Sequence, residues 1–316
     1  MKKLVLSILT VLLVAGLFGC AKAESHELKM GQAYYAAHGT KAFAVATVVV
    51  EGDTIVSAYI DEFQYLASDT VTAVPNSETL NSYVIEGYSL ASKRVNNELY
   101  SNNMSKAGST QQILTSYEAI EAYVAGKTVS ELTTLTAKDA TEVLDAVSSS
   151  TLVDTKGYIS AILAAVENAK TNAAVTYEGK LADLRLNQVY GAAHGTKCFT
   201  ITAALTAGET IVAAYIDELQ YLAADQATGC PNADNKEAFG AYIIDGYVIA
   251  SKRVNNELYS TNMAAAGSTV EIAENYNILQ AFAAGKTAAD LNVDTVSSCT
   301  LVDTKGYLAE IINAAK

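Results

Sequence analysis

The sequence has no tryptophan, only two prolines and only four cysteines in 316 residues. Few prolines and a hydrophobic fraction of 50% exclude a Pro-rich, collagen-like or disordered chain. Four cysteines are too few for a disulfide scaffold of this length. Basic residues are also scarce, since 21 Lys and Arg stand against 34 Asp and Glu, a formal net charge of −13. That balance argues against a nucleic-acid-binding protein and against electrostatic docking on anionic lipid, because both need a basic face.

The first twenty residues indicate a targeting signal. Lys2 and Lys3 precede an apolar run over residues 4–14 that is too short for a membrane-spanning helix. Residues 17–20, LFGC, resemble a bacterial lipobox. The resemblance implies a lipoprotein signal peptide over 1–19, a diacylglyceryl anchor on Cys20 and a lipidated tether over 20–30. The protein would then sit on the extracytoplasmic face of the cell membrane. An ordinary secretory signal with a chance cysteine is the alternative.

The rest of the chain contains one unit twice. Three segments show this most clearly: 36–41 recurs at 192–197, 59–66 at 215–222 with one change, and 91–101 at 250–260 unchanged. A period of about 150 residues is typical of tandem domains, because solenoid repeats are only about 20–50 residues long. We therefore expect one domain over 31–178 and a second over 179–316.

Each copy is expected to have an α+β fold. Two β-branched runs, 43–50 and 54–60, flank a turn at Gly52 and predict an antiparallel hairpin. Apolar residues at helical spacing after Asp154 predict a C-terminal helix, and the second copy repeats both features. The absence of regular strand–helix alternation argues against a doubly wound parallel sheet.

A short polar motif precedes each predicted C-terminal helix. Its shared pattern is Asp-x-x-Ser-x-x-Thr, formed by Asp145, Ser148 and Thr151 in the first copy and by Asp294, Ser297 and Thr300 in the second. This pattern resembles the acceptor motif D-x-x-S-G-A-T of the FMN-binding domain family, although Gly-Ala is replaced by Ser-Ser and Ser-Cys. Together with the lipobox, both copies resemble the duplicated, lipid-anchored members of that family in Gram-positive bacteria.

The resemblance implies two tandem FMN-binding-like domains and two covalent FMN groups. In the family a separate flavin transferase esterifies the FMN phosphate to the last Thr of the motif, here Thr151 and Thr300. The implied function is an electron carrier in extracellular electron transfer rather than an enzyme with its own substrate. A membrane quinone oxidoreductase would supply the electrons, and a soluble flavin or a metal oxide would accept them.

Other interpretations of the same residues stay open. Ser and Thr before a helix are common in turns and caps, so the motif alone also fits a purely structural role. The chain could instead be a solute-binding or adhesive lipoprotein with decayed flavin sites. The same resemblance also allows a signalling role, in which the processed signal peptide yields a pheromone.

Histidine and cysteine give weaker indications. His38 and His194 occupy equivalent turns and are candidate contacts of a flavin edge or phosphate, although a turn histidine is the simpler interpretation. One such histidine per copy, with no cysteine pair nearby, predicts no zinc site. The cysteines other than Cys20 lack counterparts in the first copy and are expected to form no essential framework: Cys198, Cys230 and Cys299.

Overall fold

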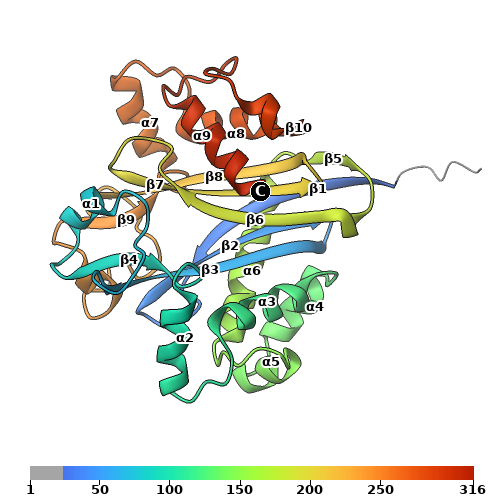
Figure 1. The fold of residues 1–316 in the computed structure, drawn as a ribbon, viewed down its shortest axis with the longest axis vertical. Coiled ribbons are helices and arrows are strands. Elements are labelled where there is room, and N and C mark those ends of the chain that lie inside the picture. The colour runs from blue at the N-terminus through green and yellow to red at the C-terminus, as the bar shows by residue number, and fades with distance from the viewer. Residues whose placement is uncertain (1–23) are drawn as a thin grey trace, which may run out of the picture.

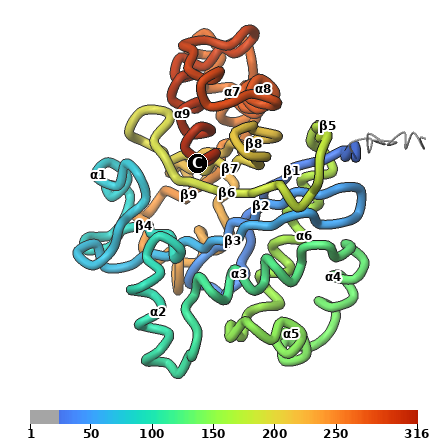
Figure 2. Tube along the Cα trace, turned by 45° about the vertical axis from the view of Figure 1, so that its right-hand side comes forward, coloured from blue at the N-terminus to red at the C-terminus, as the bar shows by residue number. Residues whose placement is uncertain are grey.

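The computed structural model describes residues 24–316, so the predicted signal peptide and Cys20 lie outside the described residues. Two antiparallel sheets pack face to face, and helices cover the outer face of each sheet (Figure 1). The tube view in Figure 2 shows the helices of the two halves on opposite sides of the sheets. The α+β class predicted from the sequence is confirmed. No helix within residues 24–316 combines the length and apolar character needed to span a bilayer.

The first half supplies five helices longer than one turn and most of one sheet. Its elements in chain order are β1 (Ser25–Tyr35), β2 (Ala42–Glu51), β3 (Thr54–Ala67), α1 (Ser77–Leu80), η1 (Asn81–Tyr83), β4 (Tyr88–Ser92), α2 (Asn97–Lys106), α3 (Ile113–Val124), α4 (Val129–Thr136), α5 (Ala140–Ala146) and α6 (Thr155–Thr171). The strand order of this sheet is β4-β3-β2-β1-β5, where β5 is the short strand Val175–Glu178 that follows α6.

The second half repeats the arrangement with fewer helices. Its elements are β5 (Val175–Glu178), η2 (Leu181–Asp183), β6 (Leu184–Gly191), β7 (Cys198–Ala207), β8 (Thr210–Ala223), η3 (Phe239–Tyr242), β9 (Tyr247–Ser251), α7 (Asn256–Ala265), α8 (Ile272–Ala283), β10 (Lys286–Thr287), η4 (Ala288–Leu291) and α9 (Thr304–Ala314). The sheet order is β10-β8-β7-β6, and β9 also pairs with β8. The short strand β5 crosses back to pair with β1 of the first sheet.

Both predicted hairpins and both predicted C-terminal helices are present. β2 pairs with β3 and β7 pairs with β8, each around a glycine with positive φ, 56° at Gly52 and 59° at Gly208. This conformation strains a residue with a Cβ, which explains glycine at these turns. One expectation needs correction: residues 25–30, predicted as tether, form the start of β1, because they pair with both β2 and β5.

Strand β2 shows why the molecule has four layers. Ala44, Ala46 and Val48 pack in the cluster that the helices α3 to α6 cover. The alternate residues Phe43 and Val45 pack in a different cluster, together with side chains of the second sheet. Successive side chains of a strand point to opposite faces, so a strand buried on both faces is largely apolar, as β2 is apart from Thr47 and Glu51. The two halves therefore share one core between their sheets.

Reciprocal hydrogen bonds relate the two halves by an approximate two-fold axis. Tyr34 donates its hydroxyl to Asp217 of the other half, and Tyr190 donates in the same way to Asp61. Two equivalent residues of the repeat also contact each other directly, since the Tyr65 hydroxyl oxygen is 2.7 Å from the Tyr221 hydroxyl oxygen. Self-complementary contacts of this kind define a two-fold interface, here between two halves of one chain.

Candidate functional site

Each acceptor threonine lies in the loop that leads into a C-terminal helix. Thr151 is half-buried between α5 and α6, and Thr300 is exposed before α9. The Thr151 hydroxyl oxygen is 3.2 Å from that of Ser109, and the equivalent Thr300–Ser268 distance is 2.9 Å. Asn275 adds a second contact in the second half, because its amide oxygen accepts the Thr300 backbone N–H at 2.7 Å. The serine contact is thus common to both hydroxyls, whereas the asparagine contact belongs to the second half alone.

Each threonine lines a cavity, and the two cavities are equivalent. Their volumes are about 460 Å³ in the first half and about 570 Å³ in the second. Most lining residues occur as repeat partners: His38 and His194, Tyr100 and Tyr259, Met104 and Met263, Ser109 and Ser268, Thr151 and Thr300, and Tyr158 and Tyr307. Both volumes fall in the range of about 300–1,000 Å³ that is typical of small-molecule sites. The repeat therefore preserves two cavities of ligand size.

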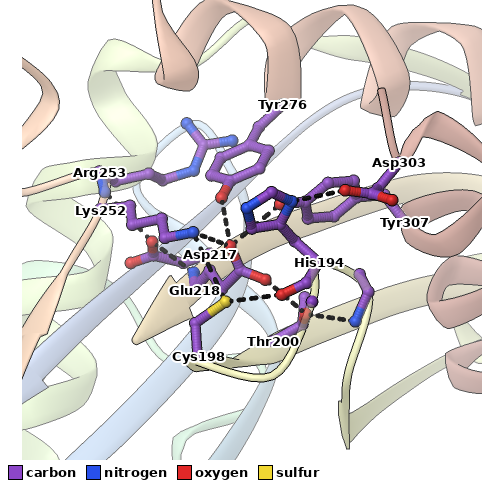
Figure 3. Close-up of polar contacts among 12 residues, drawn as sticks. His194, Cys198, Thr200, Asp217, Glu218, Lys252, Arg253, Tyr276, Asp303 and Tyr307 are labelled. Carbon is purple, nitrogen blue, oxygen red and sulfur yellow. Dashed lines mark hydrogen bonds and ion pairs between the residues drawn. The ribbon is translucent and has the colours of Figure 1, made fainter. Parts of the chain in front are cut away.

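A histidine–aspartate pair lies at each cavity. His38 Nδ1 is 2.6 Å from Asp154 Oδ2, and His194 Nδ1 is 2.6 Å from Asp303 Oδ2 (Figure 3). A carboxylate only accepts hydrogen bonds, so Nδ1 carries a proton and each ring is held in one orientation. The helices begin where the sequence predicts, but Asp154 and Asp303 bond to histidine rather than capping a helix N–H with their side chains.

A buried ion pair lies behind each cavity. Lys93 pairs with Glu62, and the Tyr158 hydroxyl donates to the same carboxylate at 3.1 Å. Lys93 itself lines the first cavity, and its ammonium nitrogen is 4.2 Å from the centre of the Tyr100 ring. Burial by itself would lower the pKa of Lys93, but Glu62 and Tyr100 raise it above its ordinary value. The wall of the first cavity therefore includes the ammonium group of a buried ion pair.

The second half repeats this pair with more hydrogen bonds. Lys252 pairs with Glu218, and the hydroxyls of Tyr307 and Tyr276 donate to that carboxylate at 3.0 and 3.3 Å (Figure 3). Thr200 donates to the other carboxylate oxygen at 3.1 Å. The first half has alanine at this position, and Glu62 Oε1 has no hydrogen-bond partner among the described residues.

Sequence reasoning pointed to these lysines only as candidates to hold a phosphate or flavin carbonyls, and it missed their buried pairing with Glu62 and Glu218. Lys93 and Lys252 stand beside arginine in a segment with two asparagines, a pattern that also fits a capped helix on the surface. A signal was nevertheless present, because Asp61-Glu62 interrupts an otherwise apolar strand and recurs at 217–218. Charged side chains inside a buried strand require partners of opposite charge. Each copy has a lysine that can serve as this partner, Lys93 or Lys252.

The other motif residues lie outside the cavities. Asp145 and Ser148 are exposed at the end of α5, and neither lines the first cavity. Asp294 and Ser297 are likewise exposed, and Asp294 accepts a 2.8 Å hydrogen bond from Lys305, which lowers its pKa. Each motif thus brings its threonine to the cavity and leaves its Asp and Ser on the surface of the molecule.

The described residues contain three cysteines, and all three are free thiols: Cys198, Cys230 and Cys299. Within residues 24–316 no group of three or more His, Cys, Asp and Glu side chains is arranged to hold a metal ion.

Comparison of the chain with family models, with curated proteins and with solved structures gave no match in any of the three searches.

Proposed function

We propose that the protein is a lipid-anchored, extracytoplasmic flavoprotein that carries electrons through FMN esterified to Thr151 and Thr300. The observation that carries this proposal is the placement of both motif threonines at equivalent cavities of ligand size. A turn that served only to begin a helix would have no need of a cavity in each half. The flavin would supply the redox chemistry, while the protein binds it, orients it and sets its electrostatic surroundings.

The residues present fit such a group. Thr151 is half-buried and Thr300 is exposed, which suits attachment by a separate transferase. Ser298 stands where the family motif has glycine and adopts a φ of 69°, the left-handed conformation that glycine favours. The second motif therefore keeps a backbone conformation suited to the family's glycine despite the substitution.

Each cavity offers contacts to the two ends of a bound FMN. A phosphodiester on the threonine would lie beside a serine hydroxyl, Ser109 or Ser268. His38 and His194, each fixed by its aspartate, present a second ring nitrogen for hydrogen bonding. In the first half Lys93, paired with Glu62, lines the cavity and would place its ammonium group beside a bound ring.

The same proposal includes the anchor and the partners. Cys20 would carry the lipid, and a Cys20→Ala variant should appear in the medium instead of the membrane fraction. A flavin transferase would load the protein and a membrane quinone oxidoreductase would reduce it. A soluble flavin or a metal oxide would then take the electrons. Such a protein would be an electron carrier rather than an enzyme with its own substrate.

Intact mass spectrometry of protein produced with a flavin transferase and FAD tests the proposal. We expect two esterified FMN groups in the wild type, one in Thr151→Val, one in Thr300→Val and none in the double variant. Thr134→Val, an exposed threonine of α4 outside both cavities, is the matched control and should keep two. Fluorescence of the denatured protein distinguishes a covalent flavin from a bound one, since only the covalent flavin survives unfolding. Two flavins in the double variant would refute the assignment.

A further inference from the structure

A second pair of equivalent cavities lies where the two halves meet. The larger has a volume of about 650 Å³ and is lined by Tyr34 from the first half and by Tyr215 and Arg253 from the second. The smaller, of about 310 Å³, is lined by the repeat partners of these residues, including Arg94. Neither cavity includes an acceptor threonine, so this pair is distinct from the proposed flavin sites.

The two cavities differ in their walls. The end of α6 contributes Asn168, Thr171 and Asn172 to the larger cavity, whereas no residue of α9 lines the smaller one. Gly229 also stands in the larger cavity where the smaller has Ala73. The larger cavity is therefore roomier and has three additional side-chain amides in its wall: Asn168, Asn172 and Asn277.

The arginine differs even more between the halves. In the first half Arg94 forms an ion pair with Glu121 of α3. In the second half α8 carries Gln280 at the position of Glu121. Arg253 donates from Nη2 to Gln280 Oε1 at 2.6 Å and from Nη1 to Asn277 Oδ1 at 3.1 Å.

The charge of Arg253 consequently lacks a carboxylate partner on α8. Its Nε donates to the Ile216 carbonyl oxygen at 2.5 Å, so all three hydrogen bonds that the guanidinium makes with described residues go to neutral oxygens. A guanidinium has five N–H donors. One N–H on each terminal nitrogen is therefore left for a ligand, and a carboxylate accepts two parallel hydrogen bonds of this kind.

A nearby carboxylate, Asp217, does not take this role. Its oxygens accept from the Ser251 hydroxyl at 2.5 Å, from Tyr34 at 2.9 Å and from the backbone N–H groups of Glu218 and Arg253. Burial raises the pKa of Asp217 above its ordinary value, while the Ser251 hydrogen bond and the nearby Arg253 charge partly offset this rise. Asp61 has the same kind of setting beside Arg94. The aspartates therefore do not explain why Arg94 has a glutamate partner and Arg253 has a glutamine in its place.

We propose that the larger interface cavity binds a small organic carboxylate, whose carboxylate group pairs with Arg253. The Tyr215 ring is centred 4.6 Å from the guanidinium carbon and holds the guanidinium in place. Figure 3 shows Arg253 beside a second aromatic ring, that of Tyr276. Asn168 and Asn277 offer amide hydrogen bonds in the same cavity. Ala33, Pro231 and Val254 line the cavity as well and suit a hydrocarbon body better than a fully polar inorganic anion.

Titration calorimetry with benzoate tests this proposal, with inorganic phosphate as the second probe. At about pH 8, Gln280→Glu restores the carboxylate that the first half has and should weaken benzoate binding at least tenfold. The substitution should be tolerated, because the equivalent site carries Glu121. If that variant fails to fold, Arg253→Gln should lose benzoate binding instead. Glu121→Gln is the matched control on the smaller cavity and should leave benzoate affinity unchanged.

Three results would overturn the proposal. The first is no saturable benzoate binding up to ~10 mM, which corresponds to less than about 3 kcal/mol of binding free energy. The second is unchanged affinity in both Gln280→Glu and Arg253→Gln. The third is binding of phosphate without benzoate, which would contradict the assigned class of ligand.

Discussion

The buried ion pairs behind the two cavities allow a sharp test, because the two copies surround the same pair differently. Lys93 and Glu62 are 1% and 0% exposed, so removal of the lysine charge leaves a carboxylate with no access to water. Breaking such a pair from one side typically costs about 3–5 kcal/mol. We expect Lys93→Met to lower the free energy of unfolding by an amount in that range.

The equivalent change in the second half should cost less. After Lys252→Met, Glu218 would still accept hydrogen bonds from Thr200, Tyr276 and Tyr307, whereas Glu62 would keep only that of Tyr158. A hydrogen bond to a charged group contributes about 1.5–3 kcal/mol. Lys93→Met should therefore destabilise the protein by at least about 1 kcal/mol more than Lys252→Met does.

Urea unfolding followed by far-ultraviolet circular dichroism measures both effects. The halves share a core, so we expect one cooperative transition. The double variant Lys93→Met/Glu62→Gln should recover much of the loss, since it removes the uncompensated charge. Lys138→Met, which breaks an exposed pair with Glu142, is the control and should change stability by less than about 1 kcal/mol. Equal losses in the two lysine variants, or no recovery in the double variant, would refute the reasoning.

Three further predictions concern single features. Burial raises the pKa of Glu121 from 4.5 to about 7, and Arg94 partly offsets this rise. The folded state therefore holds the proton more tightly, and the free energy of unfolding should fall by up to about 3 kcal/mol as the pH rises from 4.5 through 7. Urea midpoints measured across that range should show this fall in the wild type and a flatter curve in Glu121→Gln. Thr200→Val should cost about 1–3 kcal/mol in urea unfolding, because it leaves one oxygen of buried Glu218 unpaired; an unchanged midpoint would contradict this. Replacement of all three free thiols by serine should leave a folded protein that still accepts flavin, and a loss of flavin loading would show that one of them is required: Cys198, Cys230 and Cys299.

The sequence alone determined the local elements and the duplication. The β-branched runs around Gly52 and Gly208 formed the predicted hairpins, and the helical spacing after Asp154 and Asp303 gave α6 and α9. These features depend on neighbouring residues, because turn chemistry and periodicity act over a few positions of the chain. The repeat followed directly from identity between segments and required no structural information.

Only the tertiary structure decided what the repeated polar residues do. The sequence indicates that Glu62 needs a partner, but it does not identify Lys93, 31 positions away, as that partner. It also does not show that Arg253 meets Gln280 rather than a carboxylate. It also gave no sign that Tyr34 and Tyr190 exchange hydrogen bonds across a two-fold axis. Long-range partners of this kind arise when the two sheets pack together, since the packing selects which buried polar groups face one another and which face a cavity.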